Sequence, residues 1–196
     1  MRKRIDHLVL AARDLAAQAA FYRTLGFQVG AQNRHDWGTL NRIIQFDGCF
    51  LELITTEEGF DRPDADSAEA QFAIPVDDYL KRREGLGLLV LDSADAVADQ
   101  AAYERRGIAG REVLHFERKG AKPNGRAVTV AFSLAFARAP EGWKAGMFVC
   151  QQHAPEAFWN EELQRHPNGV VGIAGVIFQT PEPDAATEFF AAFAGE

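Results

Sequence analysis

One glutamate interrupts an apolar run near residue 50. Glu52 lies within Phe50-Leu51-Glu52-Leu53-Ile54, which otherwise has the composition of a buried strand. A carboxylate is rarely buried without a partner. The partner is either a divalent metal or a cation on a neighbouring strand, for which Arg42 is the first candidate. If Glu52 binds neither, it is a candidate for the general base of a reaction.

Histidines supply the next candidates. His7 lies in a short apolar stretch, where strand alternation places it on one face with Ile5 and Val9. Imidazole binds Zn, Fe, Ni or Mn well, and it also occurs as a hydrogen-bonded group in a pocket wall without any metal. His35 and His166 stand in polar turn sequences, and we expect both to be exposed.

Four side chains between residues 37 and 42 suit a small polar ligand. Trp37 offers an aromatic wall, Thr39 a hydroxyl, Asn41 an amide and Arg42 a guanidinium. A substrate carboxylate or enolate matches the last two groups. Because neighbours on a strand point to opposite faces, Asn41 and Arg42 are not both expected to reach one cavity. The alternative is an ordinary turn before a strand, with Trp37 filling a gap in the core.

A second polar segment follows residue 118. It carries Lys119, Lys122, Asn124 and Arg126, separated by glycine and proline. This composition predicts a hairpin with positive charge. The hairpin either receives an anionic substrate tail or is a solvated turn.

An internal repeat shows which elements position these residues. Residues 8–27 align without a gap to residues 89–108, a shift of 81, with eight identities in twenty positions. Each copy has an apolar run, an Asp that can cap a helix, an Ala-rich stretch and a Gly that can end it. Strand-like runs follow each copy, at residues 28–31, 40–46 and 49–54 and then at 112–118, 126–137 and 147–151. Both halves are therefore predicted to be strand, helix and three further strands.

The repeat divides the chain. We predict a first βαβββ module at residues 1–60, a linker with a short helix at 61–85, a second module at 86–153 and an extension at 154–196. The extension resembles the start of a third module, with an apolar strand at 173–178 and a helix that ends at Gly195. Either the chain is a fragment of a longer protein, or this strand–helix unit has another role, such as completing a homodimer.

These features together resemble the vicinal oxygen chelate superfamily. The residues that show this resemblance are Ile5-Asp6-His7-Leu8-Val9, Phe21-Tyr22 followed by Leu25-Gly26-Phe27, and Glu52 in the fourth strand. Two further segments, residues 37–42 and 150–156, are similar to its glyoxalase-like domain branch. The resemblance implies an α+β fold in which tandem βαβββ modules form an open curved barrel, with an extra C-terminal strand–helix unit.

The resemblance also implies a metal inside the barrel, held by residues of the first and fourth strands of each module. His7 and Glu52 occupy two such positions. The counterpart of His7 in the second module is Leu88, and no carboxylate stands at 149–151. His153 is a candidate replacement, with His115 as another. His7, Glu52 and His153 would resemble a non-haem iron site or a three-ligand zinc site; the cofactor is then a divalent metal (Zn, Fe, Ni or Mn), or none.

Composition excludes several classes of protein. The 196 residues carry 28 acidic and 21 basic groups, a formal charge of −7, so the basic surface of a nucleic-acid binder is not expected. No apolar run approaches the roughly 20 residues that span a bilayer. Two cysteines in apolar runs indicate reduced core thiols and a cytoplasmic location.

Three functions follow from these features. The first is a metal-dependent lyase or isomerase that acts on a small oxygenated metabolite between the modules, with Glu52 as catalytic residue; an extradiol-type dioxygenase is a variant of it. The second is a metal-free protein that sequesters a small ligand. The third is a non-catalytic fold that dimerises. Nucleic acids and membranes are not expected as partners.

Overall fold

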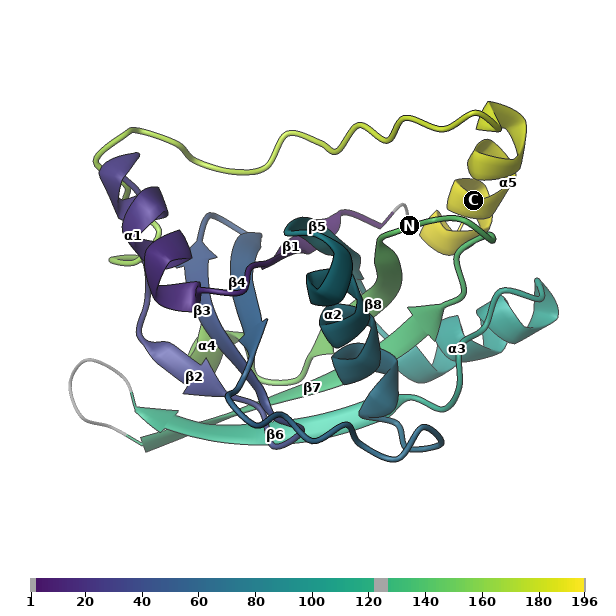
Figure 1. Cartoon of the computed structure of the whole chain (residues 1–196), viewed down its shortest axis with the longest axis horizontal. Helices are drawn as coiled ribbons and strands as arrows, with labels where there is room; N and C mark the ends of the chain where they lie inside the picture. The colour runs from purple at the N-terminus through teal and green to yellow at the C-terminus, as the bar shows by residue number, and fades with distance from the viewer. Residues whose placement is uncertain (1–2, 122–126, 196) are drawn as a thin grey trace.

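The computed structural model describes residues 3–121 and 127–195. It contains one eight-stranded sheet with the strand order β2-β3-β4-β1-β5-β8-β7-β6 (Figure 1). Most of the hairpin predicted near Lys122, Asn124 and Arg126 lies outside the described residues. The strands are β1 Ile5–Ala11, β2 Gln32–Arg34, β3 Thr39–Gln45, β4 Phe50–Thr56, β5 Gly85–Asp92, β6 Leu114–Ala121, β7 Ala127–Ala137 and β8 Gly146–Gln152.

The sheet is symmetric about its centre, as the repeat predicts. β1 pairs in parallel with β4, and β5 pairs in parallel with β8. The two modules meet where β1 and β5 pair in antiparallel fashion. The predicted α+β fold of tandem βαβββ modules is therefore confirmed, and the sheet curls into a half-barrel (Figure 1).

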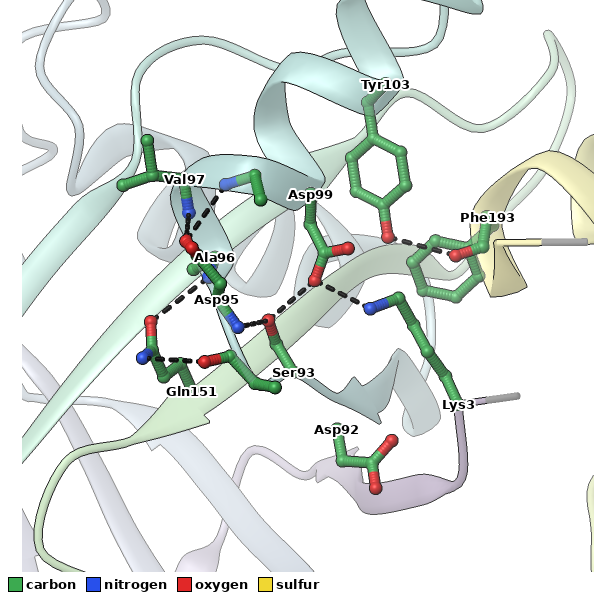
Figure 2. Close-up of polar contacts among 12 residues, drawn as sticks. Lys3, Asp92, Ser93, Asp95, Ala96, Val97, Asp99, Tyr103, Gln151 and Phe193 are labelled. Carbon is green, nitrogen blue, oxygen red and sulfur yellow. Dashed lines mark hydrogen bonds and ion pairs between the residues drawn. The ribbon is translucent and has the colours of Figure 1, made fainter. Parts of the chain in front are cut away.

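The repeated helices begin at the predicted caps. Asp14 accepts a hydrogen bond from the backbone of α1 (Leu15–Thr24), and Asp95 does the same for α3 (Ala96–Arg105). Figure 2 shows the second cap, together with Asp99, which accepts hydrogen bonds from Ser93 and Lys3. These bonds satisfy backbone donors that the first helical turn leaves free.

The linker folds into more than the predicted short helix. α2 (Ala70–Arg82) has thirteen residues and contains Pro75. Its buried side chains, among them Phe72 and Val76, pack against Val9 and Leu88 in the main core. The helix thus closes part of the half-barrel by burying apolar surface that the sheet alone would expose.

The C-terminal extension forms its helix but not its predicted strand. Residues 170–180 join no strand of the described sheet, and Ile177 is 98% exposed. In each module the first strand pairs with the fourth, and β4 and β8 already have neighbours on both sides, so a third copy of β1 has no free strand of that kind with which to pair. The segment instead crosses the molecule as an extended strap to α5 (Pro183–Ala194) (Figure 1).

The strap is anchored at both ends. His166 was predicted to be exposed, but it is only 8% exposed. Its Nδ1 accepts a hydrogen bond from the backbone N–H of Gln28, and its Nε2 donates to the Gln45 carbonyl 2.8 Å away. At the other end, Tyr103 donates a 3.0 Å hydrogen bond to the Phe193 carbonyl of α5 (Figure 2). The extension is therefore an integral part of this chain's fold.

Candidate functional site

A small cavity lies inside the half-barrel and is lined by residues of both modules. Its volume is about 40 Å³, which holds a few water molecules or a group the size of a carboxylate. The first module supplies most of its polar groups, and the second supplies aromatic walls and one cation. The lining residues are His7, His35, Asn41, Ile43, Phe50, Glu52, Phe72, Phe116, Arg118, Phe132, Leu134, Phe148, Cys150 and Phe158.

His7 is held in a fixed orientation on β1. Its Nδ1 lies 2.5 Å from Oδ1 of Asp6, whose Oδ2 accepts a 2.9 Å hydrogen bond from Gln152. The ring stacks on Phe50 with centroids 4.2 Å apart. Because an ionised carboxylate can only accept, Nδ1 carries the proton. His7 Nε2 is therefore left to face Glu52, whose Oε2 lies 3.8 Å away.

Glu52, on β4, is the central group of the cavity. It is buried, and burial raises the pKa of its carboxyl. Asn41 donates a short hydrogen bond to Oε1, and Asn33 in turn donates to the Asn41 side-chain oxygen at 3.2 Å. His7 and Arg118 favour the carboxylate electrostatically. A buried carboxyl with a raised pKa beside an oriented imidazole is suited to act as a general base.

His35 completes the polar wall, although we expected it to be exposed. It is 7% exposed and stacks on Trp37 with centroids 4.6 Å apart. Its Nδ1 lies 2.8 Å from the Thr39 hydroxyl, and its Nε2 lies 3.9 Å from Glu52. Burial lowers the pKa of His35 to about 3, so the ring is neutral. His35 lies in the turn between β2 and β3, where strand alternation does not apply, so no local pattern in the sequence placed it in the cavity.

The predicted substrate-binding cluster divides. Asn41 lies in the cavity, whereas Trp37 and Thr39 contact His35 and do not line the cavity. Arg42 lies beside Asn41 on the strand, and its guanidinium donates to the Gly30 carbonyl. Arg42 is therefore neither a cavity residue nor the partner of Glu52, because alternation turns it to the other face of β3.

Arg118 is the cation that the cavity does contain, and the sequence reasoning missed it. It lies on β6, two residues after the cavity residue Phe116. Among the described residues its buried Nη1 has no hydrogen-bond partner. Burial lowers the pKa of the guanidinium, while Glu52 raises it. A buried cation with an unused donor is suited to an anionic ligand.

His153 does not join His7 and Glu52 as predicted. Its Nε2 lies 2.8 Å from the Ser133 hydroxyl, which also contacts His115 at 3.0 Å. Ser133 stands on β7 between Phe132 and Leu134, which both line the cavity. Strand alternation therefore puts Ser133 and the two histidines on the opposite face of the sheet.

The second module offers no ligands at the implied metal positions. Val9 and Val90 are equivalent in the repeat; Val9 pairs with Glu52, and Val90 pairs with Phe148. The counterpart of Glu52 is therefore Phe148, which is next to the predicted range 149–151. The counterpart of His7 is the buried Leu88. Within residues 3–121 and 127–195, no three His, Cys, Asp or Glu side chains are grouped to hold a metal. The donor set thus does not fit the four-ligand metal site.

Comparisons with known proteins agree with the architecture. The model of the glyoxalase-like domain family matches residues 5–193. A hypothetical protein from Staphylococcus aureus superimposes with a TM-score of 0.60 and 18% identity, over 77% of this chain and 59% of its own. This chain thus spans less than two thirds of that protein's length. No curated protein sequence matches the chain.

Two named enzymes are also similar to this chain in structure. A mutant of 4-hydroxymandelate synthase from Streptomyces coelicolor gives a TM-score of 0.50 at 14% identity, covering 78% of this chain and 48% of its own. Methylmalonyl-CoA epimerase from Mycobacterium tuberculosis gives 0.49 at 16%, covering 79% and 91%. At these identities the likeness concerns the fold. In the part of the chain that is described, no helix is long and apolar enough to cross a membrane.

Proposed function

The chain belongs to the glyoxalase-like domain family of the vicinal oxygen chelate superfamily, and we propose that it is an enzyme of the isomerase or lyase type. Its substrate is a small oxygenated acid bound between the modules, and its central step is a proton transfer. The observation that carries this proposal is Glu52, a buried carboxyl with a raised pKa, placed by Asn41 and facing His7.

Glu52 acts as the general base. It takes a proton from the carbon next to the substrate's carbonyl or carboxylate group, and the electron pair of that C–H bond moves onto the oxygen. Arg118 balances the charge of the acid and of the developing enolate. Glu52 then returns the proton to a different position in an isomerase, or the enolate expels a leaving group in a lyase. General-base catalysis of this kind contributes about 10²- to 10⁴-fold.

His7 and His35 assist in different ways. His7 Nε2 faces Glu52 from 3.8 Å and presents a polar atom to the carboxyl. The Asp6 hydrogen bond holds the His7 ring in this orientation. His35 stays neutral, since its pKa is about 3. Among the described residues that line the cavity, Glu52 is the one that bears a carboxyl group.

The aromatic walls support this chemistry. Phe116, Phe132 and Phe148 keep the cavity apolar opposite Glu52. In such a setting the charges of Arg118 and of the enolate interact more strongly than in water. The two free cysteines, Cys49 and Cys150, are buried, which supports a cytoplasmic location.

The experiment follows proton exchange by NMR. A 2-oxo acid such as 2-oxooctanoate is incubated with the protein in D₂O, and loss of its C3 proton signal is recorded. We expect exchange with the wild type and with Glu117→Gln, an exposed carboxylate on β6, but not with Glu52→Gln. If the Glu52→Gln variant binds the acid but does not exchange its proton, Glu52 is supported as the general base.

The second candidate is a metal-free protein that sequesters a ligand. The observation that favours it is the aromatic lining supplied by the second module. The same experiment separates the two functions. A wild type that binds the acid but exchanges its protons no faster than free solution would support sequestration and contradict the enzyme.

A further inference from the structure

The small cavity adjoins a much larger outer groove. The groove has a volume of about 530 Å³ and is lined by residues of β3, β6, β7 and the segment 157–163. Ile43, Arg118 and Phe158 line both spaces. The small cavity, at about 40 Å³, has room only for the reacting end of a molecule. We expect a ligand that binds there to extend its remaining atoms past these shared residues into the groove.

Phe158 is one of the residues that line both spaces. It ends the short helix α4 (Pro155–Phe158), and its ring packs on Phe50 and Phe132, with centroids 5.1 and 5.7 Å apart. One amide fixes the position of this segment: Gln45 donates to the Phe158 carbonyl and accepts from the Asn160 backbone, both at 2.9 Å. Phe158 is thus tied to β3.

Charges on the described residues of the groove favour a ligand with one negative group. Arg118 lies at the junction, where its Nη1 is buried with no partner among the described residues. At the mouth, Lys119 is outnumbered by the exposed Glu161 and Glu162. A second anionic group, such as the phosphate of a nucleotide carrier, would meet repulsion there.

The floor of the groove is apolar between these charges. Its apolar side chains come from three directions: Ile43 from β3, Val128 and Val130 from β7, and Leu163 from the segment after α4. Apolar atoms that leave water on such a surface gain about fourfold in affinity for each buried methylene.

We propose that the substrate is a monoanionic organic acid with an apolar body. Its carboxylate and its reacting carbon enter the small cavity, where the carboxylate pairs with Arg118, and its body leaves past Arg118 to lie along the groove against Ile43, Val128 and Leu163. This deepens the proposed function, on which it rests for the identity of the reacting end. The binding geometry itself requires no reaction.

Calorimetric titration with four probes tests the proposal. Acetate, octanoate, 1-octanol and octyl phosphate differ in apolar length and in charge. We expect octanoate to bind at least 100-fold more tightly than acetate, and at least 10-fold more tightly than 1-octanol and octyl phosphate. Equal affinities for acetate and octanoate would overturn the role of the groove, and tighter binding of octyl phosphate would overturn the limit to one charge.

Two variants locate the binding groups. Arg118→Met is expected to remove the preference for octanoate over 1-octanol. Leu163→Trp is expected to weaken octanoate at least 10-fold while acetate is unchanged, because the indole fills the groove beyond the junction. Leu163→Glu, in the same half-buried turn, is a second block, and Glu117→Gln on the outer face is the control.

The outcome is independent of the reaction. If octanoate binds as expected but no proton exchange occurs, the groove assignment stands and the enzyme proposal fails. If 2-oxo acids exchange through Glu52 but octanoate binds no better than acetate, the enzyme stands and the groove assignment fails.

Discussion

The two modules share one backbone plan but contribute opposite chemistry to the cavity. At one pair of equivalent positions, the first module has His7 and the second has Leu88. At the other pair, the first has Glu52 and the second has Phe148. The first module therefore supplies titratable groups and the second supplies packing, with Arg118 as its polar contribution to the cavity.

The difference extends to the neighbours of these residues. Phe50, which pairs with His7, provides the surface on which the imidazole stacks. Its counterpart Gly146 pairs with Leu88, and a Cβ at Gly146 would lie 2.5 Å from the Leu88 side chain. A repeat thus preserves strand register while the packing around each position is rebuilt, which is why equivalence of position does not transfer function.

The largest expected effect is the loss of proton exchange when Glu52 of the first module is changed. Glu52→Gln should lower the rate of proton exchange by about 10²- to 10⁴-fold, because it removes the base without changing its shape. Leu88→Met, at the counterpart of His7, should leave the exchange rate unchanged at a cost below about 1.5 kcal/mol in stability. Exchange kinetics by NMR and urea unfolding measure both. Comparable losses of rate in the two variants would contradict a division of labour.

Phe148 tests whether the second module contributes packing to the cavity. This side chain is fully buried between the modules, so Phe148→Ala should cost about 3–5 kcal/mol of unfolding free energy through lost burial and a cavity. Urea denaturation provides the measurement. A cost below about 1 kcal/mol would show that the second module does not depend on this packing.

The pH dependence of stability tests the polar wall. The pKa of His35 is lowered to about 3 in the folded state, so the unfolded chain binds the extra proton as the pH falls below about 6.5. The stability due to the neutral ring is present above that pH, and about 2 kcal/mol of it should be lost between pH 6.5 and 5. His35→Gln should flatten this part of a urea-unfolding series. An unchanged slope in the variant would mean that His35 is not buried in its neutral form.

The contribution of Glu52 to stability depends on pH in the opposite direction. Because its pKa is raised on folding, its contribution is favourable at low pH and is lost as the pH rises through the folded-state pKa. Glu52→Gln is therefore expected to be more stable than the wild type at pH 8 and to lose this advantage at pH 4. Thermal unfolding at the two pH values checks the direction. A variant less stable than the wild type at pH 8 would contradict a strained, buried carboxylate.

The last prediction concerns the packing of Gly146 against Leu88 in the second module. Gly146→Ala should cost about 1–3 kcal/mol through overpacking against Leu88. Combining it with Leu88→Ala should give a smaller loss than the sum of the two single changes, since the added methyl enters the space vacated. Additive losses in a double-mutant cycle would show that the two side chains do not compete for that space.

The sequence predicted what local patterns determine. The 81-residue repeat placed both modules, the aspartate caps placed α1 and α3, and strand alternation separated Asn41 from Arg42. These features depend on near neighbours and on period, so a single chain is enough to find them.

The features that escaped prediction depend on long-range packing. His35 lies in a polar turn sequence, yet Phe72 of α2 and Phe116 of β6 pack around its ring. Residues 173–178 have a strand's composition, but β4 and β8, the kind of strand that pairs with β1 and β5, already have neighbours on both sides. The pairing of β8 with β7 places His153 beside Ser133, on the face of the sheet away from Glu52. In each case a distant element decides the outcome.

The central claim is that the first module's Glu52 moves a proton without a bound metal. The direct test is deuterium exchange of 2-oxooctanoate by protein stripped with a chelator, with its metal content determined by elemental analysis. We expect exchange to persist below about 0.1 metal per chain and to disappear in Glu52→Gln. Exchange that returns only when Zn, Fe, Ni or Mn is restored to one per chain, and that is lost together with the metal in His7→Ala, would contradict the account.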